Sequence, residues 1–137
     1  MKRWSALVLA AALLYVAPAF AQKAKDAVAP PAVQKEFDSF IAKFRTALKA
    51  NDVAAVISMT QLPFMKDANV SDAAQFRDRV YKPEFTAKSR ACLQRSKAVY
   101  DRDGANNENF FMFCGEQMFT FTRTPTGFLF TEIGVKD

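Results

Sequence analysis

Two cysteines, Cys92 and Cys114, and the complete absence of histidine define the side-chain chemistry that this 137-residue chain offers. A catalytic cysteine needs a neighbouring base that activates its thiol, and histidine is the usual one. Without histidine the chain also lacks a Ser-His-Asp arrangement, a histidine general base and the commonest catalytic zinc ligands. We therefore expect a protein that is not an enzyme and has no metal or cofactor.

Carboxylates are the remaining groups that could do chemistry. Asp101 and Asp103 are separated by one residue and precede Gly104, but the other ligands of an EF-hand loop are missing. The Asp103-Gly104 pair is typical of a hairpin turn instead. Glu116, which follows Gly115, is a candidate for a carboxylate that points into a pocket. The alternative for Glu116 is exposure to solvent or an ion pair with a nearby arginine.

Residues 1–21 have the pattern of a secretory signal peptide. Two basic residues precede an apolar run from Ala6 to Val16, and Ala19-Phe20-Ala21 matches the small-x-small cleavage pattern. The run is shorter than the ~20 apolar residues that a spanning helix needs, which argues against a stable membrane anchor. We expect cleavage near Ala21-Gln22 and a mature protein that is periplasmic or secreted.

An oxidising compartment favours a disulfide between the two cysteines. Two geometries for this bridge stay open. A hairpin centred on Asp103 makes Cys92 and Cys114 cross-strand partners, because each lies eleven residues from its centre. If Cys92 instead ends a helix, the bridge ties that helix to the strand that carries Cys114.

The mature chain is long enough for one domain, and its basic residues are interspersed with acids. Nucleic-acid binding needs a massed basic patch, so we expect no nucleic-acid partner. Residues 22–32 contain Pro30-Pro31 and predict a flexible leader. Residues 33–137 are expected to form the domain.

Helices are predicted in the first part of this domain. An apolar stripe at helical spacing predicts a helix over 33–50, formed by Val33, Phe37, Phe40, Ile41, Phe44, Ala47 and Leu48. Asn51 is expected to end it in a left-handed conformation, and Asp52 to cap a short helix over 53–59. Leu62 to Met65 suggests a short strand or an extended turn. Residues 71–92 predict two helical pieces, capped by Ser71 and broken at Pro83.

Strands are predicted after residue 94. Lys97 to Tyr100 is one candidate, and residues 109–122 suggest one long strand with a bulge at Gly115. The Thr124–Gly127 segment is a turn signal, and residues 128–135 complete the sheet. Helices followed by an antiparallel meander predict an α+β fold, with a curved sheet wrapped around the first helix.

The pattern of apolar residues resembles the NTF2-like superfamily (SnoaL-like, cystatin-like α+β). The resemblance rests on Phe37-x-x-Phe40-x-x-x-Phe44-x-x-Ala47 followed by Asn51-Asp52, on Leu62-Pro63-Phe64, Phe76 and Phe85, on residues 110–121 and on Gly127-Phe128-x-Phe130-x-x-Ile133. The resemblance covers most of residues 33–135. Within the superfamily, the chain is similar to small secreted bacterial members without an assigned activity. The resemblance implies a cone whose interior is a ligand pocket or an active site, and dimerisation through the outer face of the sheet.

The catalytic residues of that superfamily do not carry over to this chain. Dehydratase-like and cyclase-like members use a histidine with an acidic partner, and no histidine is present. Ketosteroid-isomerase-like members use a tyrosine in the first helix. The mature chain has only Tyr81 and Tyr100, and neither lies there. The resemblance therefore implies a non-catalytic member.

The density of aromatic residues in the strands has two interpretations: a packed core with a partly covered second face, or an apolar binding surface or pocket mouth. Methionines such as Met59, Met65, Met112 and Met118 suit either, because the side chain is adaptable. The candidate pocket residues are Phe44, Met59, Phe64, Phe76, Phe85, Met112, Phe119, Phe121, Phe130 and Glu116.

Three functions follow from these patterns. The first is a periplasmic or secreted binding or accessory module that holds a small apolar ligand or a partner peptide. The second is a secreted protein–protein factor, such as an inhibitor or immunity-type protein, which uses its sheet face as a homodimer or with another protein. The third is an enzyme that relies on Asp or Glu in the pocket.

Overall fold

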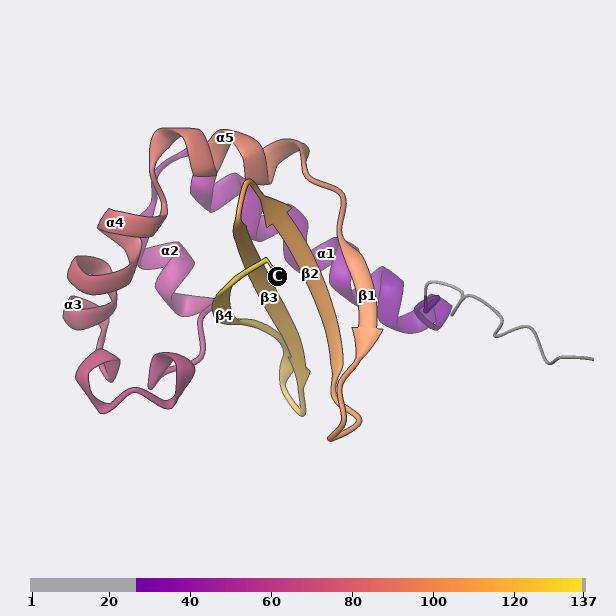
Figure 1. The fold of residues 1–137 in the computed structure, drawn as a ribbon. Coiled ribbons are helices and arrows are strands. Elements are labelled where there is room, and N and C mark those ends of the chain that lie inside the picture. The colour runs from indigo at the N-terminus through magenta and orange to yellow at the C-terminus, as the bar shows by residue number, and fades with distance from the viewer. Residues whose placement is uncertain (1–26, 137) are drawn as a thin grey trace, which may run out of the picture.

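The computed structural model describes residues 27–136, so the predicted signal peptide and the start of the leader lie outside the described residues. The fold is α+β, as predicted, with helices first and a four-stranded antiparallel sheet of order β1-β2-β3-β4 after them (Figure 1). The elements are α1 (Pro31–Lys49), α2 (Val53–Ser58), η1 (Phe64–Lys66), η2 (Ala68–Val70), α3 (Ala73–Phe76), η3 (Arg77–Tyr81), α4 (Lys82–Glu84), α5 (Ala87–Arg95), β1 (Val99–Arg102), β2 (Glu108–Cys114), β3 (Gln117–Thr124) and β4 (Gly127–Val135).

Helix α1 forms because its apolar residues recur at helical spacing, and this stripe faces the sheet. Its buried residues are Val33, Phe37, Ile41, Phe44, Ala47 and Leu48. The helix begins at Pro31, two residues earlier than predicted, because proline at the first helical position has no N–H that needs a partner. Asn51 follows in the expected left-handed conformation, with a φ of 50°. Asp52 caps α2 by accepting a hydrogen bond from the Ala55 amide, also as predicted.

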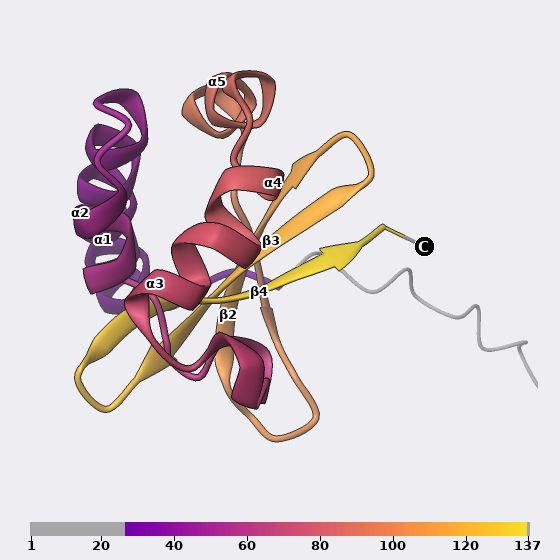
Figure 2. The same ribbon diagram turned by 90° about the vertical axis from the view of Figure 1, so that its left-hand side faces the viewer.

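The helices surround one face of the sheet and leave the other uncovered. Helix α1 runs behind the strands in Figure 1, and α5 lies across one end of them. Figure 2 shows α1 and α2 together on one side of the sheet, with α3 and α4 in the foreground in front of β4. No helix within residues 27–136 lies over the opposite face. The fold therefore has two layers, one of helices and one of strands, and the second face of the sheet is open.

The helical segment after Asp72 differs from the prediction in its cap and in its break. Asp72, rather than Ser71, caps α3, because its carboxylate accepts from the Gln75 amide at 2.8 Å. The helix also continues through Pro83 and ends at Glu84, with Phe85 as its non-helical C-cap. A π-helical turn over Arg77–Tyr81 precedes the proline, and this wider spacing keeps Lys82 helical next to Pro83. The predicted break at Pro83 is therefore wrong by two residues.

The segment from Thr60 to Lys66 forms a bridge and a tight turn instead of the expected strand or extended piece. Thr60 makes a single parallel bridge to Phe130 in β4. Pro63 then starts the short 3₁₀ turn η1. Met65 and Lys66 have φ values of 52° and 59°, which is the left-handed region. Two adjacent non-glycine residues in that region cost roughly 1–2 kcal/mol each, so the loop is held there by its surroundings.

The first hairpin decides between the two disulfide geometries. Val99 pairs with Phe111 and Arg102 with Glu108, so the loop spans 103–107 and its centre is Ala105 rather than Asp103. Cys92 lies in α5 and forms the disulfide with Cys114 in β2, with a Cα–Cα distance of 5.9 Å. The cross-strand pairing is wrong. The alternative, a bridge from a helix to a strand, is confirmed.

The predicted single strand over 109–122 is two strands. Cys114 pairs with Gln117, and Gly115-Glu116 is the two-residue turn between β2 and β3. Gly115 has a φ of 62°, which is the conformation that the first position of a tight type II′ hairpin turn requires. The bulge occurs one strand later, where the β3–β4 register shifts between Thr120 and Phe121. The predicted Thr124–Gly127 turn and the strand after it are confirmed.

No helix within the described residues is long and apolar enough to cross a membrane.

Candidate functional site

The sheet and α1 enclose an aromatic interior that contains most of the predicted pocket residues. Eight of the ten are at most 3 % exposed, namely Phe44, Phe64, Phe76, Phe85, Met112, Phe119, Phe121 and Phe130. The Phe130 ring lies 5.1–6.4 Å, centroid to centroid, from the other six phenylalanines of this group. The structure therefore brings these rings together as a packed core, with their faces and edges in contact.

The other two predicted pocket residues lie apart from this core. Met59 is half-buried and borders grooves along α1. Glu116 is exposed in the β2–β3 turn. Its exposure matches the alternative that the sequence left open.

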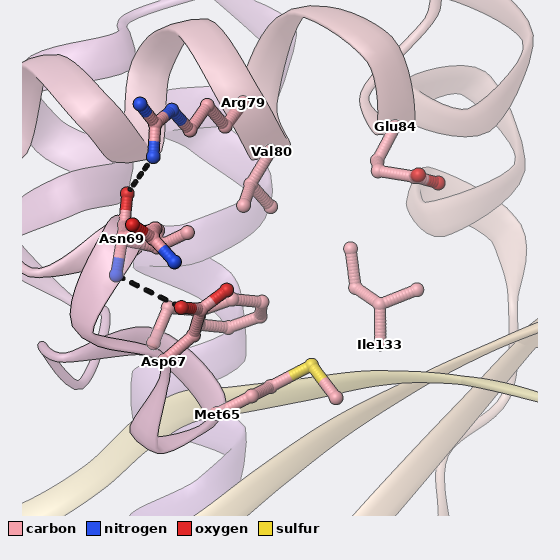
Figure 3. Close-up of a pocket in the computed structure, with 9 residues that line it drawn as sticks. Met65, Asp67, Asn69, Arg79, Val80, Glu84 and Ile133 are labelled. Atoms are coloured by element: carbon pink, nitrogen blue, oxygen red, sulfur yellow. Dashed lines mark hydrogen bonds between the residues drawn. The ribbon is translucent and has the colours of Figure 1, made fainter.

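A cleft of about 640 Å³ opens beside the core, between the loop of η1 and η2, the segment η3–α4 and β4 (Figure 3). We name it the Asp67–Glu84 cleft. Its lining residues are Phe64, Met65, Asp67, Asn69, Val70, Arg79, Val80, Glu84 and Ile133. Phe64, Val70 and Val80 are buried and Ile133 is half-buried, so they give the cleft an apolar floor beneath polar side chains. A concave apolar surface with a few placed polar groups is the usual form of a small-molecule site.

One wall of the cleft is built on the backbone of Asn69. The Asn69 amide donates to Asp67 Oδ1 at 2.8 Å, and its carbonyl accepts from Arg79 Nη1 at 2.6 Å. These bonds bring a carboxylate and a guanidinium to the same wall, as Figure 3 shows. The Asn69 side chain takes no part in either bond.

Glu84 and Ile133 lie on the opposite wall in Figure 3. Gln117 at the start of β3 donates its side-chain amide to Glu84 Oε2. Ser89 in α5 in turn donates its hydroxyl to Gln117 Oε1 at 3.0 Å. All three side chains are half-buried. This chain of hydrogen bonds restricts the Glu84 carboxylate to one position at the edge of the cleft.

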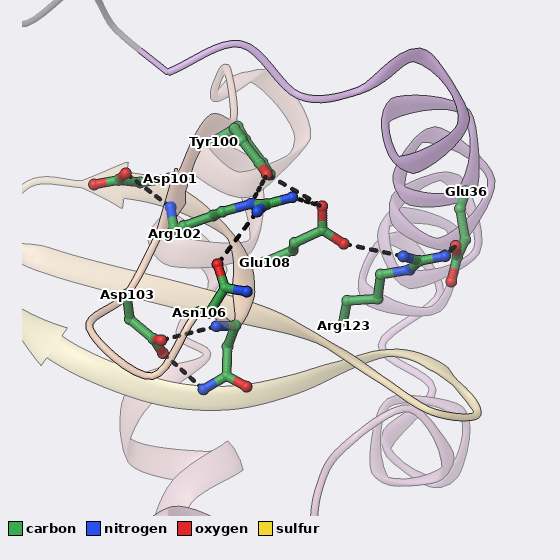
Figure 4. Close-up of polar contacts among 9 residues, drawn as sticks. Glu36, Tyr100, Asp101, Arg102, Asp103, Asn106, Glu108 and Arg123 are labelled. Atoms are coloured by element: carbon green, nitrogen blue, oxygen red, sulfur yellow. Dashed lines mark hydrogen bonds and ion pairs between the residues drawn. The ribbon is translucent and has the colours of Figure 1, made fainter.

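A polar network at the other end of the sheet has a structural role (Figure 4). Glu108 accepts from Arg102 and Tyr100 at 3.2 Å and from Arg123 at 3.0 Å, and Arg123 reaches Glu36 of α1 at 2.9 Å. Burial by itself raises the pKa of Glu108, but the hydrogen bonds from Arg123, Arg102 and Tyr100 outweigh it and hold the pKa below the ordinary value. The network ties α1 to β1, β2 and β3.

The open side of the sheet is the second surface that could bind a partner. Val99 is 43 % exposed and Phe113 is 38 % exposed, and Phe111 between them is half-buried. The hydroxyl of Thr120, which pairs with Phe111, is buried and has no hydrogen-bond partner among residues 27–136. A buried hydroxyl of this kind is uncommon in native structures.

Comparison with protein-family models, with curated proteins and with solved structures finds no match to this chain.

The sequence indicated two cleft residues, Phe64 as a pocket residue and Met65 as an adaptable methionine. It missed the polar ones, Asp67, Asn69, Arg79 and Glu84. A signal for part of this wall was present, because Asp67-Ala-Asn69 has the spacing with which an aspartate carboxylate accepts from an amide two residues later. Arg79 and Glu84 carry no such local signal, since only the path of the helix brings them to the cleft.

Proposed function

We propose that this protein is a non-catalytic binding module that holds a small apolar ligand in the Asp67–Glu84 cleft. The observation that supports this proposal is the combination of a volume of about 640 Å³, an apolar floor and fixed polar groups on two walls. Sites for small ligands commonly have volumes of ~300–1,000 Å³, so the cleft has a suitable size. The tightly packed aromatic interior is the rigid support beneath it.

The absence of histidine supports the non-catalytic part of the proposal. The polar groups around the cleft are carboxylates, an amide and a guanidinium. An enzyme based on Asp or Glu needs a carboxyl group with a raised pKa that faces the reacting atoms. A binding module needs only fixed donors and acceptors, which is what these residues supply.

We also propose that the protein works outside the cytoplasm, after cleavage near Ala21-Gln22. The sequence pattern of residues 1–21 supports this, and the Cys92–Cys114 disulfide is compatible with an oxidising compartment. A relation to the NTF2-like superfamily stays part of the proposal. Its support is the order of elements and the position of α1 against one face of the sheet.

A second candidate function is a protein–protein factor that binds through the open side of the sheet, as a homodimer or with another protein. Exposed Val99 and Phe113 favour it. An interface there would cover apolar surface that the described helices leave open. Sedimentation velocity over a range of concentrations tests the homodimer. A monomer at all concentrations counts against it.

Thermal denaturation with a panel of small apolar compounds tests the main proposal, because a ligand that binds only the folded state raises the melting temperature. The matched variants are Asn69→Trp, which places a ring in the cleft and keeps both backbone hydrogen bonds, and Lys88→Trp on the exposed face of α5. We expect compounds that stabilise the wild type to stabilise Lys88→Trp equally and Asn69→Trp much less. Equal stabilisation of both variants would place the site elsewhere and contradict the proposal.

A further inference from the structure

Three charged side chains surround the Asp67–Glu84 cleft without forming an ion pair within residues 27–136. They are Asp67, Arg79 and Glu84. The ion pairs within residues 27–136 all lie outside the cleft. They join Arg77 and Lys82 to Asp78, Arg102 to Glu108, and Arg123 to Glu36 and Glu108. The cleft is therefore a place where two carboxylates and one guanidinium lie above apolar residues with their charges uncompensated by a neighbour.

Each of the three charged groups is instead held by a neutral hydrogen-bond partner. Asp67 Oδ1 accepts from a backbone amide, Arg79 Nη1 donates to a backbone carbonyl, and Glu84 Oε2 accepts from the Gln117 amide. Asp67 Oδ2, Glu84 Oε1 and Arg79 Nη2 make no hydrogen bond within the described part of the chain. Groups fixed in this way lose little conformational entropy when they bind a ligand.

We infer that the ligand of this cleft is a small zwitterion with an apolar body, such as an apolar amino acid. This inference rests on the proposed function. The ammonium group of the ligand binds the carboxylates of Glu84 and Asp67, and its carboxylate binds the guanidinium of Arg79. The apolar side chain lies on Phe64, Val70, Val80 and Ile133.

Ligands with a single charge satisfy this arrangement less well. An amine without a carboxylate leaves Arg79 uncompensated and brings a second cation near it. A carboxylate without an amine faces both Asp67 and Glu84. Asp67 and Arg79 are exposed and Glu84 is half-buried, so solvent screens part of each mismatch, and each mismatch lowers affinity by a moderate amount.

Four probes test the inference on the wild-type protein by calorimetric titration: L-phenylalanine, 2-phenylethylamine, 3-phenylpropanoate and benzyl alcohol. They share an aromatic ring and differ in charge. Because ion pairs with exposed groups contribute little and the half-buried Glu84 contributes more, we expect L-phenylalanine to bind several-fold more tightly than each of the others. Equal affinities for all four would overturn the zwitterion inference and leave the proposed function standing. Binding by none of the four would overturn the inference. The proposed function is decided separately, by whether the apolar panel stabilises the wild type more than it stabilises Asn69→Trp.

Charge-removing variants assign the two ends of the ligand. Arg79→Gln is expected to remove the preference for L-phenylalanine over 2-phenylethylamine, and Asp67→Asn with Glu84→Gln the preference over 3-phenylpropanoate. Arg95→Gln and Glu116→Gln are matched controls, because both residues are exposed and outside the cleft. The inference is contradicted if the cleft variants keep the wild-type preferences, or if the controls lose them.

Discussion

The aromatic interior and the Asp67–Glu84 cleft share Phe64, yet they differ in almost every physical respect. The interior consists of rings that contact one another and are closed to solvent. The cleft is open, and its charged side chains have neutral partners. The residues that best predict a pocket by composition are thus the residues that fill the core. The groups available to a ligand come from a loop and a helix that the aromatic pattern does not include.

The largest effect is expected from Phe130→Ala in the interior. Its ring is fully buried and contacts six others, so truncation leaves a cavity that the neighbours cannot fill. We expect a loss of about 3–5 kcal/mol in the free energy of unfolding, measured by urea denaturation. Phe113→Ala, on the open side of the sheet, is the matched control and should cost less than about 1 kcal/mol. Similar losses for both would mean that the interior is not the tightly packed region.

The disulfide is expected to have the next largest effect. It closes a loop with a sequence separation of 22 and joins α5, which carries Ser89, to β2. Replacing both cysteines with alanine should lower the free energy of unfolding by about 3 kcal/mol. A reducing agent should lower the stability of the wild type by a similar amount and leave the double variant unchanged. A wild type insensitive to reduction would contradict this expectation.

Glu108 differs from the cleft carboxylates because it has ion-pair partners. Its pKa in the folded protein is lowered, so its contribution is complete above the unfolded pKa of about 4.5 and is lost as the pH falls through the lower folded pKa. Glu108→Gln should therefore cost about 1 kcal/mol at neutral pH, where its exposed arginine partners limit the effect.

The same variant should flatten the acid side of the stability profile. Urea denaturation at a series of pH values from neutral to about 2.5 measures both effects. A variant that retains the full loss of wild-type stability below pH 4.5 would assign that loss to other carboxyl groups.

The smallest effect is expected from Asp67→Asn in the cleft. Asparagine also caps, so the hydrogen bond to the Asn69 amide is kept, and no ion pair of the described residues is lost. The free energy of unfolding should change by less than about 0.5 kcal/mol. A loss above about 1.5 kcal/mol would show that the Asp67 carboxylate stabilises the fold rather than being available to a ligand.

The sequence predicted elements whose pattern is local. The stripe from Val33 to Leu48 specifies α1, and the Thr124–Gly127 turn specifies the last hairpin. Gly115 was assigned to the wrong feature, because a glycine with positive φ suits a bulge and a tight turn equally. The break at Pro83 was misplaced, because a π turn before a proline leaves no mark in the apolar spacing.

The cleft could not be predicted in the same way. Its walls come from the loop at 64–70, the helical segment at 79–84 and β4, and only tertiary packing brings Asp67, Arg79 and Ile133 together. Glu84 is positioned by Gln117 at a sequence separation of 33. Aromatic density, by contrast, correctly indicates where apolar side chains gather, but it does not distinguish a filled interior from an open one.

Methyl NMR of the protein during titration with L-phenylalanine tests the central claim most directly, because one spectrum reports on both regions. The methyl groups of Val70, Val80 and Ile133 report on the cleft, and those of Val56 and Met112 report on the interior. The account predicts saturable shifts at the three cleft residues and none at the two interior residues. Shifts at Val56 and Met112, with Ile133 unchanged, would place the ligand in the interior and contradict it.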